Sequence, residues 1–109
     1  MAIYANITAD QGSTFDTIVD VTDTNGDPVD LTSYTARGQV RKTYNSSTAI
    51  DFNTTKNSSG EIGLSLTSAQ TGAMKAGRYV YDVEIVSAAG IVTRVVEGQF
   101  EITPRVTRP

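Results

Sequence analysis

The chain has 109 residues, the length of one compact domain, and 39% of them are apolar, which is enough to form a single core. The net charge of −3 predicts no general attraction to nucleic acid or to an anionic membrane. Cysteine and histidine are both absent, which excludes disulfides, cysteine-based zinc sites and histidine-dependent nucleophilic catalysis. The opening residues lack the basic start and apolar run of a signal peptide, and no segment has the roughly 20 apolar residues of a membrane span.

Apolar and polar residues alternate with a period of two along five segments, a pattern typical of strands with one buried and one solvated face. In chain order these segments are residues 15–21, 35–41, 62–66, 79–85 and 96–102. In the second segment we expect the small and apolar even positions to face inward, with Arg37, Gln39 and Arg41 aligned outward. The short apolar run 49–52 predicts an edge strand. The Ser/Thr/Asn-rich segments on either side, 42–48 and 53–59, predict exposed loops.

The segment DTNGDPVDL, residues 23–31, has two interpretations. Its D-x-N-x-D spacing begins like a calcium loop, but the sixth position holds proline instead of glycine and the twelfth lacks glutamate. Asn25-Gly26 is instead typical of a hairpin turn, in which both residues would adopt positive φ and Asp23 or Asp27 would accept backbone amides. We therefore predict a turn, after which the chain returns to the core through Val29 and Leu31.

Residues 67–77 break the alternation. Thr67 and Gln70 have the spacing of a helical capping box, and Gly77 is a natural helix stop. We expect one or two helical turns that cross between two sheets, with Met74 closing the end of a sandwich. The segment Ser87–Gly90 predicts a tight hairpin between the last two strands.

These elements predict an all-β fold, a single antiparallel β-sandwich of about seven strands with one short helical crossover. We place this domain at residues 1–103. A basic tail, residues 104–109, is expected to leave the last strand at Pro104.

Six carboxylates lie at outward positions of the predicted strands, and either a glycosidase-type acid/base pair or an ordinary solvated face would explain them. They are Asp16, Asp20, Asp82, Glu84, Glu97 and Glu101. The solvated face is preferred, because a catalytic pair needs a cleft and a domain of this size has little room for one. We accordingly predict no enzymatic activity, no cofactor and no metal site. Four N-x-[ST] sequons are explained as a by-product of polar loops; they begin at Asn6, Asn45, Asn53 and Asn57.

Arginines and tyrosines supply the candidate contacts to a partner. Arg37 and Arg41 are expected to pair with acidic residues of neighbouring strands rather than to grip phosphate. Alternation places Tyr79 and Tyr81 in the core and Tyr34 at a sheet corner, so Tyr44 alone looks exposed. The basic tail after a proline is suited to act as a docking strand. The candidate partner-binding residues are therefore Arg105, Val106, Arg108 and Tyr44.

Several phrases of the sequence coincide, in order, with a known pattern. They are DQGSTF (10–15), GDPVDLTSYTAR (26–37), AGRYVYDVE (76–84), VTRVVEG (92–98) and ITPRVTR (102–108). Together they resemble a family of short structural proteins of tailed bacteriophages, especially cyanophages and related marine viruses. The chain also resembles the Ig-like N-terminal domain of phage baseplate upper proteins.

The resemblance implies an Ig-like β-sandwich that is part of the virion and has no enzymatic activity. The expected role is an assembly or adaptor subunit of the tail or baseplate, present in multiple copies, with other phage structural proteins as partners and no direct contact to nucleic acid or membrane. Two alternatives stay open. One is a capsid or neck decoration protein, and the other is a carbohydrate-binding module for attachment to a host surface.

Overall fold

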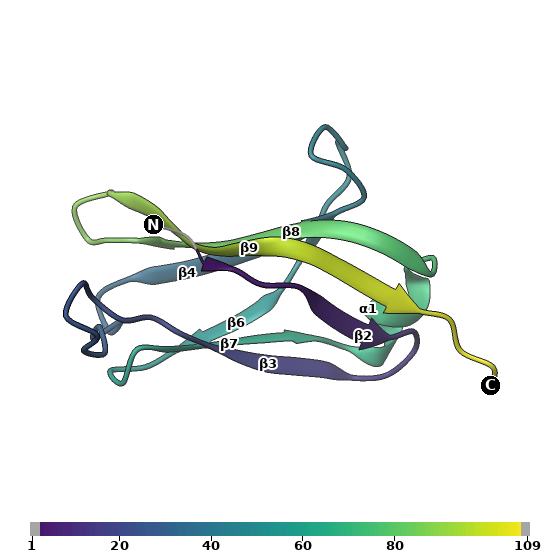
Figure 1. The fold of residues 1–109 in the computed structure, drawn as a ribbon, viewed down its shortest axis with the longest axis horizontal. Coiled ribbons are helices and arrows are strands. Elements are labelled where there is room, and N and C mark those ends of the chain that lie inside the picture. The colour runs from purple at the N-terminus through teal and green to yellow at the C-terminus, as the bar shows by residue number, and fades with distance from the viewer. Residues whose placement is uncertain (1–2, 108–109) are drawn as a thin grey trace.

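The structure is a computed structural model that describes residues 3–107. Two β-sheets pack face to face in it (Figure 1). The elements are β1 (Ile3–Tyr4), β2 (Ile7–Asp10), β3 (Phe15–Asp20), β4 (Thr35–Arg41), β5 (Ile50–Asp51), β6 (Asn53–Lys56), β7 (Glu61–Leu66), α1 (Ser68–Ala73), β8 (Gly77–Val86) and β9 (Val92–Thr103). No helix within the described residues is long and apolar enough to span a bilayer.

The larger sheet has the order β1-β9-β8-β4-β5, and β2 also pairs with β9, further along that strand than β1 does. The smaller sheet has the order β3-β7-β6. Both β1 and β2 run parallel to β9, whereas the other strand pairings of the described chain are antiparallel. In the nomenclature of immunoglobulin domains, β9-β8-β4-β5 is a G-F-C-C′ sheet and β3-β7-β6 is a B-E-D sheet. The fold is therefore an Ig-like β-sandwich with α1 as the crossover from one sheet to the other.

The inward side chains of both sheets form one hydrophobic core with an aromatic centre. Phe100, which is fully buried, packs edge-on against Phe15 and Phe52 with ring centroids 5.3 and 5.8 Å apart, and against Tyr81 at 6.3 Å. Each such pair adds about 0.5–1.5 kcal/mol beyond the burial of its area. Since the chain has neither cysteine nor tryptophan, this cluster replaces the disulfide and the tryptophan that fill the core of antibody domains.

Tyr79 and Tyr81 are core residues, as predicted, and each uses its hydroxyl group. The Tyr79 hydroxyl donates to the carbonyl oxygen of Lys75 at 2.7 Å, which is the tyrosine corner of Ig-like folds at the entrance to strand F. Tyr81 stands two residues later, where antibody domains have their second cysteine, and donates to the carbonyl oxygen of Ala5 at 2.7 Å. Burial raises the pKa of Tyr81 to about 12, with a smaller contribution from Tyr4.

The five alternating segments are strands with the predicted faces. In β4, Gly38 and Val40 are buried, while Arg37 and Gln39 are exposed. In β8 and β9 every second residue is buried from Tyr79 to Ile85 and from Val96 to Ile102. The hairpin between them closes as predicted, because the Gly90 amide donates to the Ser87 carbonyl at 2.9 Å.

The helix begins as predicted and ends earlier. The Thr67 hydroxyl accepts the Gln70 amide at 3.1 Å, and the Gln70 side chain accepts the Thr67 amide at 2.8 Å, which makes a complete capping box. The prediction that the helix runs to Gly77 is wrong. Met74 already adopts an extended conformation, because its side chain is buried in the core and its carbonyl accepts the Gln11 side chain at 2.9 Å. Gly77 opens β8 with a φ of 141°.

The prediction of an exposed loop over residues 53–59 is wrong in its first half. The edge strand predicted at 49–52 is present as β5, and after the buried Phe52 the chain passes to the other sheet and continues as β6 against β7. Polar residues can form β6 because it is an edge strand with little burial. Thr54 fastens it to the larger sheet by donating to the Ala36 carbonyl at 3.1 Å.

The first hairpin follows the turn interpretation with one correction. The Gly26 amide donates to the Asp23 carbonyl at 3.0 Å, and the Asp23 carboxylate accepts the amides of Asn25 and Asp27 at 2.9 and 3.0 Å. Gly26 alone has a positive φ, of 82°, so the prediction that Asn25 shares it is wrong. A three-residue loop of this kind needs a left-handed residue only at its last position. Leu31 then enters the core with no exposed surface.

Candidate interaction surface

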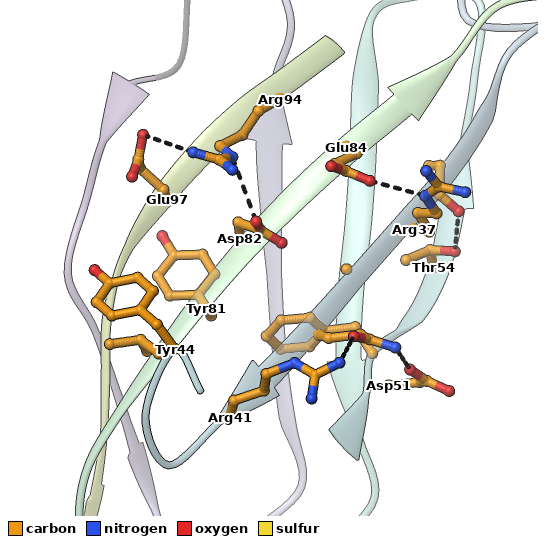
Figure 2. A pocket seen from close by; sticks show the side chains of 15 residues that line it. Arg37, Arg41, Tyr44, Asp51, Thr54, Tyr81, Asp82, Glu84, Arg94 and Glu97 are labelled. Atoms are coloured by element: carbon orange, nitrogen blue, oxygen red, sulfur yellow. Dashed lines mark hydrogen bonds and ion pairs between the residues drawn. The ribbon is translucent and has the colours of Figure 1, made fainter. Parts of the chain in front are cut away.

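The outer face of the larger sheet carries an open recess of about 810 Å³ over β4 and β8 (Figure 2). Its charged lining consists of three arginines and four carboxylates, namely Arg37, Arg41, Arg94, Asp51, Asp82, Glu84 and Glu97. Tyr44 lines it from the loop after β4, which projects from the body of the sandwich in Figure 1. Tyr44 is exposed as predicted, with 77% of its surface accessible, but the prediction that it is the only exposed tyrosine is wrong, because Tyr4 is 63% exposed.

Ion pairs order this face. Arg37 Nε lies 2.9 Å from Glu84 Oε1, and the two residues are directly opposite in the β4–β8 register, as the cross-strand prediction for Arg37 requires. Arg94 bridges two carboxylates, Asp82 Oδ2 at 3.3 Å and Glu97 Oε2 at 3.6 Å (Figure 2). Exposed pairs of this type contribute about 0–1 kcal/mol to folding. Their effect is therefore to fix the pattern of charge on the surface rather than to hold the sheets together.

Arg41 does not follow the prediction of a carboxylate partner. Its guanidinium donates to the Ser46 carbonyl and, at 3.0 Å, to the Gln39 side chain, which in turn donates to Asp51 at 2.7 Å. The reason is the register, which sets Val80 opposite Arg41. Arg41 consequently braces the loop that carries Tyr44.

The carboxylates predicted on outward positions separate into two groups. Asp82, Glu84 and Glu97 come together at the recess, whereas Asp16, Asp20 and Glu101 lie exposed on other parts of the two sheets. The pKa of Asp82 is raised, chiefly because the carboxylate is partly buried. The positive charge of Arg94 opposes this rise, the negative charges of Glu84 and Glu97 add to it, and Arg41 opposes it to a smaller extent. Within residues 3–107, no group of three or more potential metal-ligating side chains is placed to hold an ion.

The tail residues lie apart from the recess. Strand β9 ends at Thr103, so the chain leaves the sheet at Pro104 as predicted. Arg105 packs on its own domain: its guanidinium covers Gly12, and its amide donates to the Gln11 side chain at 3.3 Å. Val106 is 97% exposed. The prediction for Arg108 concerns a residue outside the described part of the chain.

The N-terminal strands were missing from the predicted elements. The odd positions Ile3, Ala5, Ile7 and Ala9 alternate with polar or aromatic residues, which is the signal that would have revealed them. Both strands run along β9, β1 beside its middle and β2 beside its end, where the tail begins (Figure 1).

Strand order and surface together define an Ig-like β-sandwich with an open, charged G-F-C-C′ face. No family model and no curated protein matches the chain. Among solved structures it is similar to the internalin-like protein lmo2027 of Listeria monocytogenes (TM-score 0.48, 17% identity), covering 95% of this chain and 28% of that one. It is also similar to murine CRIg (TM-score 0.44, 10% identity, 92% of both chains). A third is a family 123 glycoside hydrolase from Clostridium perfringens (TM-score 0.44, 13% identity, 96% of this chain and 23% of that one).

Proposed function

We propose that the chain is a non-enzymatic structural protein of a tailed-bacteriophage virion, an assembly or adaptor subunit of the tail or baseplate that acts through protein–protein contacts. The five phrases that resemble phage structural proteins support the virion assignment. The polar G-F-C-C′ face supports the mode of action.

The observation that carries the proposal is the recess on that face. It has a fixed charge pattern, in which Arg37 and Arg94 are held by carboxylates, and an exposed tyrosine at its margin. Arginine and tyrosine, together with tryptophan, are enriched at the energetic centres of protein interfaces. A neighbouring subunit with complementary charge would find these groups already oriented, which lowers the entropy lost on binding.

The virion assignment is tested by mass spectrometry of purified virions of the phage that encodes the chain. We expect its peptides at a level that corresponds to many copies in each particle. Their absence from purified virions would overturn the proposal. A reconstruction of the particle would then separate the tail or baseplate from the capsid or neck, where a decoration protein would sit.

The role of the recess is tested by a paired substitution, Arg37→Glu with Tyr44→Ala, in the virion protein. We expect normal folding of the isolated chain and reduced incorporation into particles. Arg78→Glu is the matched control, because Arg78 is an exposed arginine of β8 that does not line the recess. Incorporation equal to wild type would contradict the role of this face. Binding of a polysaccharide by the isolated chain at micromolar affinity would instead favour the carbohydrate-binding module.

A further inference from the structure

The smaller sheet has an open edge along β3. Constant-type immunoglobulin domains place strand A beside strand B in this sheet. Here the strands that precede B are β1 and β2, and they pair with β9 in the larger sheet. Among the described residues, β3 therefore has one strand neighbour, β7.

Within residues 3–107, the outward backbone groups of β3 have no strand partner at this edge. The Val21 amide donates to the Gly60 carbonyl at 2.7 Å, which continues the β3–β7 register and marks the odd-numbered residues as those bonded to β7. Because successive residues of a strand point their amides to opposite sides, Asp16, Ile18 and Asp20 direct theirs outward. Their side chains are also exposed.

A groove of about 500 Å³ runs beside this edge, between β3 and β2. It is lined by residues 6–10 and 13–17, on the side of the sandwich where β2 and β3 lie one above the other in Figure 1. The amides of Ala5 and Gln11 both bond to β9, so on β2 the even-numbered Thr8 directs its backbone away from β9. An extended peptide in this groove would meet free backbone groups of β3, which is the geometry of strand addition.

We propose that this groove receives residues Val106–Arg108 of a second copy as a strand added beside β3. The inference rests on the assembly role proposed above and names its partner. Val106 and Ile18 are exposed β-branched residues, at 97% and 63%, one on the proposed donor and one on the acceptor. The acceptor edge is acidic, and the segment after Glu101 contains arginines and no carboxylate side chain. Charge and apolar surface are therefore complementary.

The register is restricted by these residues. If Val106 pairs with Ile18, the residue directly after the groove residue Thr17, an antiparallel strand sets Arg108 opposite Asp16, which lines the groove, whereas a parallel strand sets it opposite Asp20, beyond the groove. Either direction joins the arginine to a carboxylate. Only the charge and the sequence position of Arg108 bear on this pairing. Cross-strand pairs of β-branched residues and of opposite charges both stabilise a sheet.

The donor is already positioned to leave its own domain. Arg105 is fastened over Gly12 and to Gln11, and the next residue, Val106, is almost fully exposed. Donor and acceptor are different surfaces of the chain, so the contact is heterologous. Contacts of this type close into rings or continue as filaments, so they can join many copies of one chain.

The test uses two blocked variants of the chain. One lacks Val106–Pro109 and keeps only the acceptor, while the other carries Ile18→Pro and keeps only the donor. Proline is tolerated at an edge strand where its missing amide faces outward, as the Ile18 amide does. In sedimentation velocity from micromolar to millimolar concentration, we expect wild type to associate with rising concentration and each variant alone to stay monomeric. The two variants mixed should form a heterodimer and nothing larger.

A wild type that stays monomeric at millimolar concentration overturns the proposal, as does a mixture that fails to dimerise while wild type associates. Both results leave the virion assignment intact, since that is judged by the protein content of particles. If Ile18→Pro does not fold, the pair Asp16→Lys and Asp20→Lys replaces it. We expect about fivefold weaker association from the charge reversal. Recovery with Arg108→Asp in the donor would support the pairing, and no recovery would refute it.

Discussion

The hydroxyl group of Tyr81 donates a hydrogen bond to the carbonyl oxygen of Ala5, which lies 76 positions earlier in the chain. The bond joins β8, at the centre of the larger sheet, to the N-terminal segment on its edge. Substitution Tyr81→Phe removes the donor and leaves a partly buried carbonyl without its partner, so we expect a loss of about 1–3 kcal/mol in the free energy of unfolding. Urea denaturation measures the loss. Tyr44→Phe, at an exposed tyrosine, is the control and should change nothing.

The same tyrosine makes stability depend on alkaline pH. The pKa of Tyr81 is raised to about 12 in the folded chain, against about 10 for an unfolded tyrosine. The fold therefore favours the neutral phenol, and this contribution is fully present below pH 10 and is lost as pH rises from about 10 to about 12. An ultraviolet titration of phenolate should show one late ionisation in wild type that is missing in Tyr81→Phe. A late ionisation that survives the substitution would mean that another tyrosine is responsible.

Gly98 makes room for the N-terminal segment. A β-carbon at this position of β9 would overlap the backbone of Ala5. We expect Gly98→Ala to cost about 1–3 kcal/mol, as overpacking does, because β1 would have to move off the sheet. The cost should disappear in a chain that lacks residues 1–5, which a double-mutant cycle measures. Gly26→Ala is the control: its cost comes from a φ of 82° with no atom within 4 Å, so the deletion should not relieve it.

The sequence predicted the elements whose signal is contained in a short stretch of residues. Strands with one buried face, such as β4 and β8, show alternation because every second side chain enters the core. The capping box of α1 lies within four residues and was also predicted from the sequence. The parallel pairing of the N-terminal strands with β9 was not predicted, because it depends on contacts such as Tyr81 with Ala5 and on the room left at Gly98, far away in the sequence.

The candidate surface was also predicted only in part. For Arg37 a cross-strand carboxylate partner was predicted from its outward position, whereas its identity as Glu84 follows from the β4–β8 register that the structure shows. The partners of Arg41 were not predicted, since one of them is the Ser46 carbonyl, in a loop whose conformation no periodicity encodes. The groove between β2 and β3 depends on which sheet the first strands join. That choice is made by tertiary packing.

The tyrosine corner provides a fourth prediction. Tyr79→Phe keeps the packing of the ring and removes the 2.7 Å hydrogen bond to the Lys75 carbonyl, which ties the end of the crossover to β8. We expect a loss of about 0.5–1.5 kcal/mol in the free energy of unfolding, the usual value of one such bond. Amide hydrogen exchange should quicken between α1 and β8 before it quickens elsewhere. Uniform acceleration over the whole chain would show that the corner acts on global stability only.

The ion pair between Arg37 and Glu84 is expected to matter little for folding. Its nitrogen and oxygen are 2.9 Å apart, but the arginine side chain is 59% exposed, so solvent screens the attraction. A double-mutant cycle with Arg37→Ala and Glu84→Ala should give a coupling energy of about 0–1 kcal/mol, decreasing as salt is added. Any larger effect of these substitutions on particle incorporation would then reflect the interface and not the fold. A coupling of several kcal/mol would instead show that the outer face is needed for the stability of the sandwich.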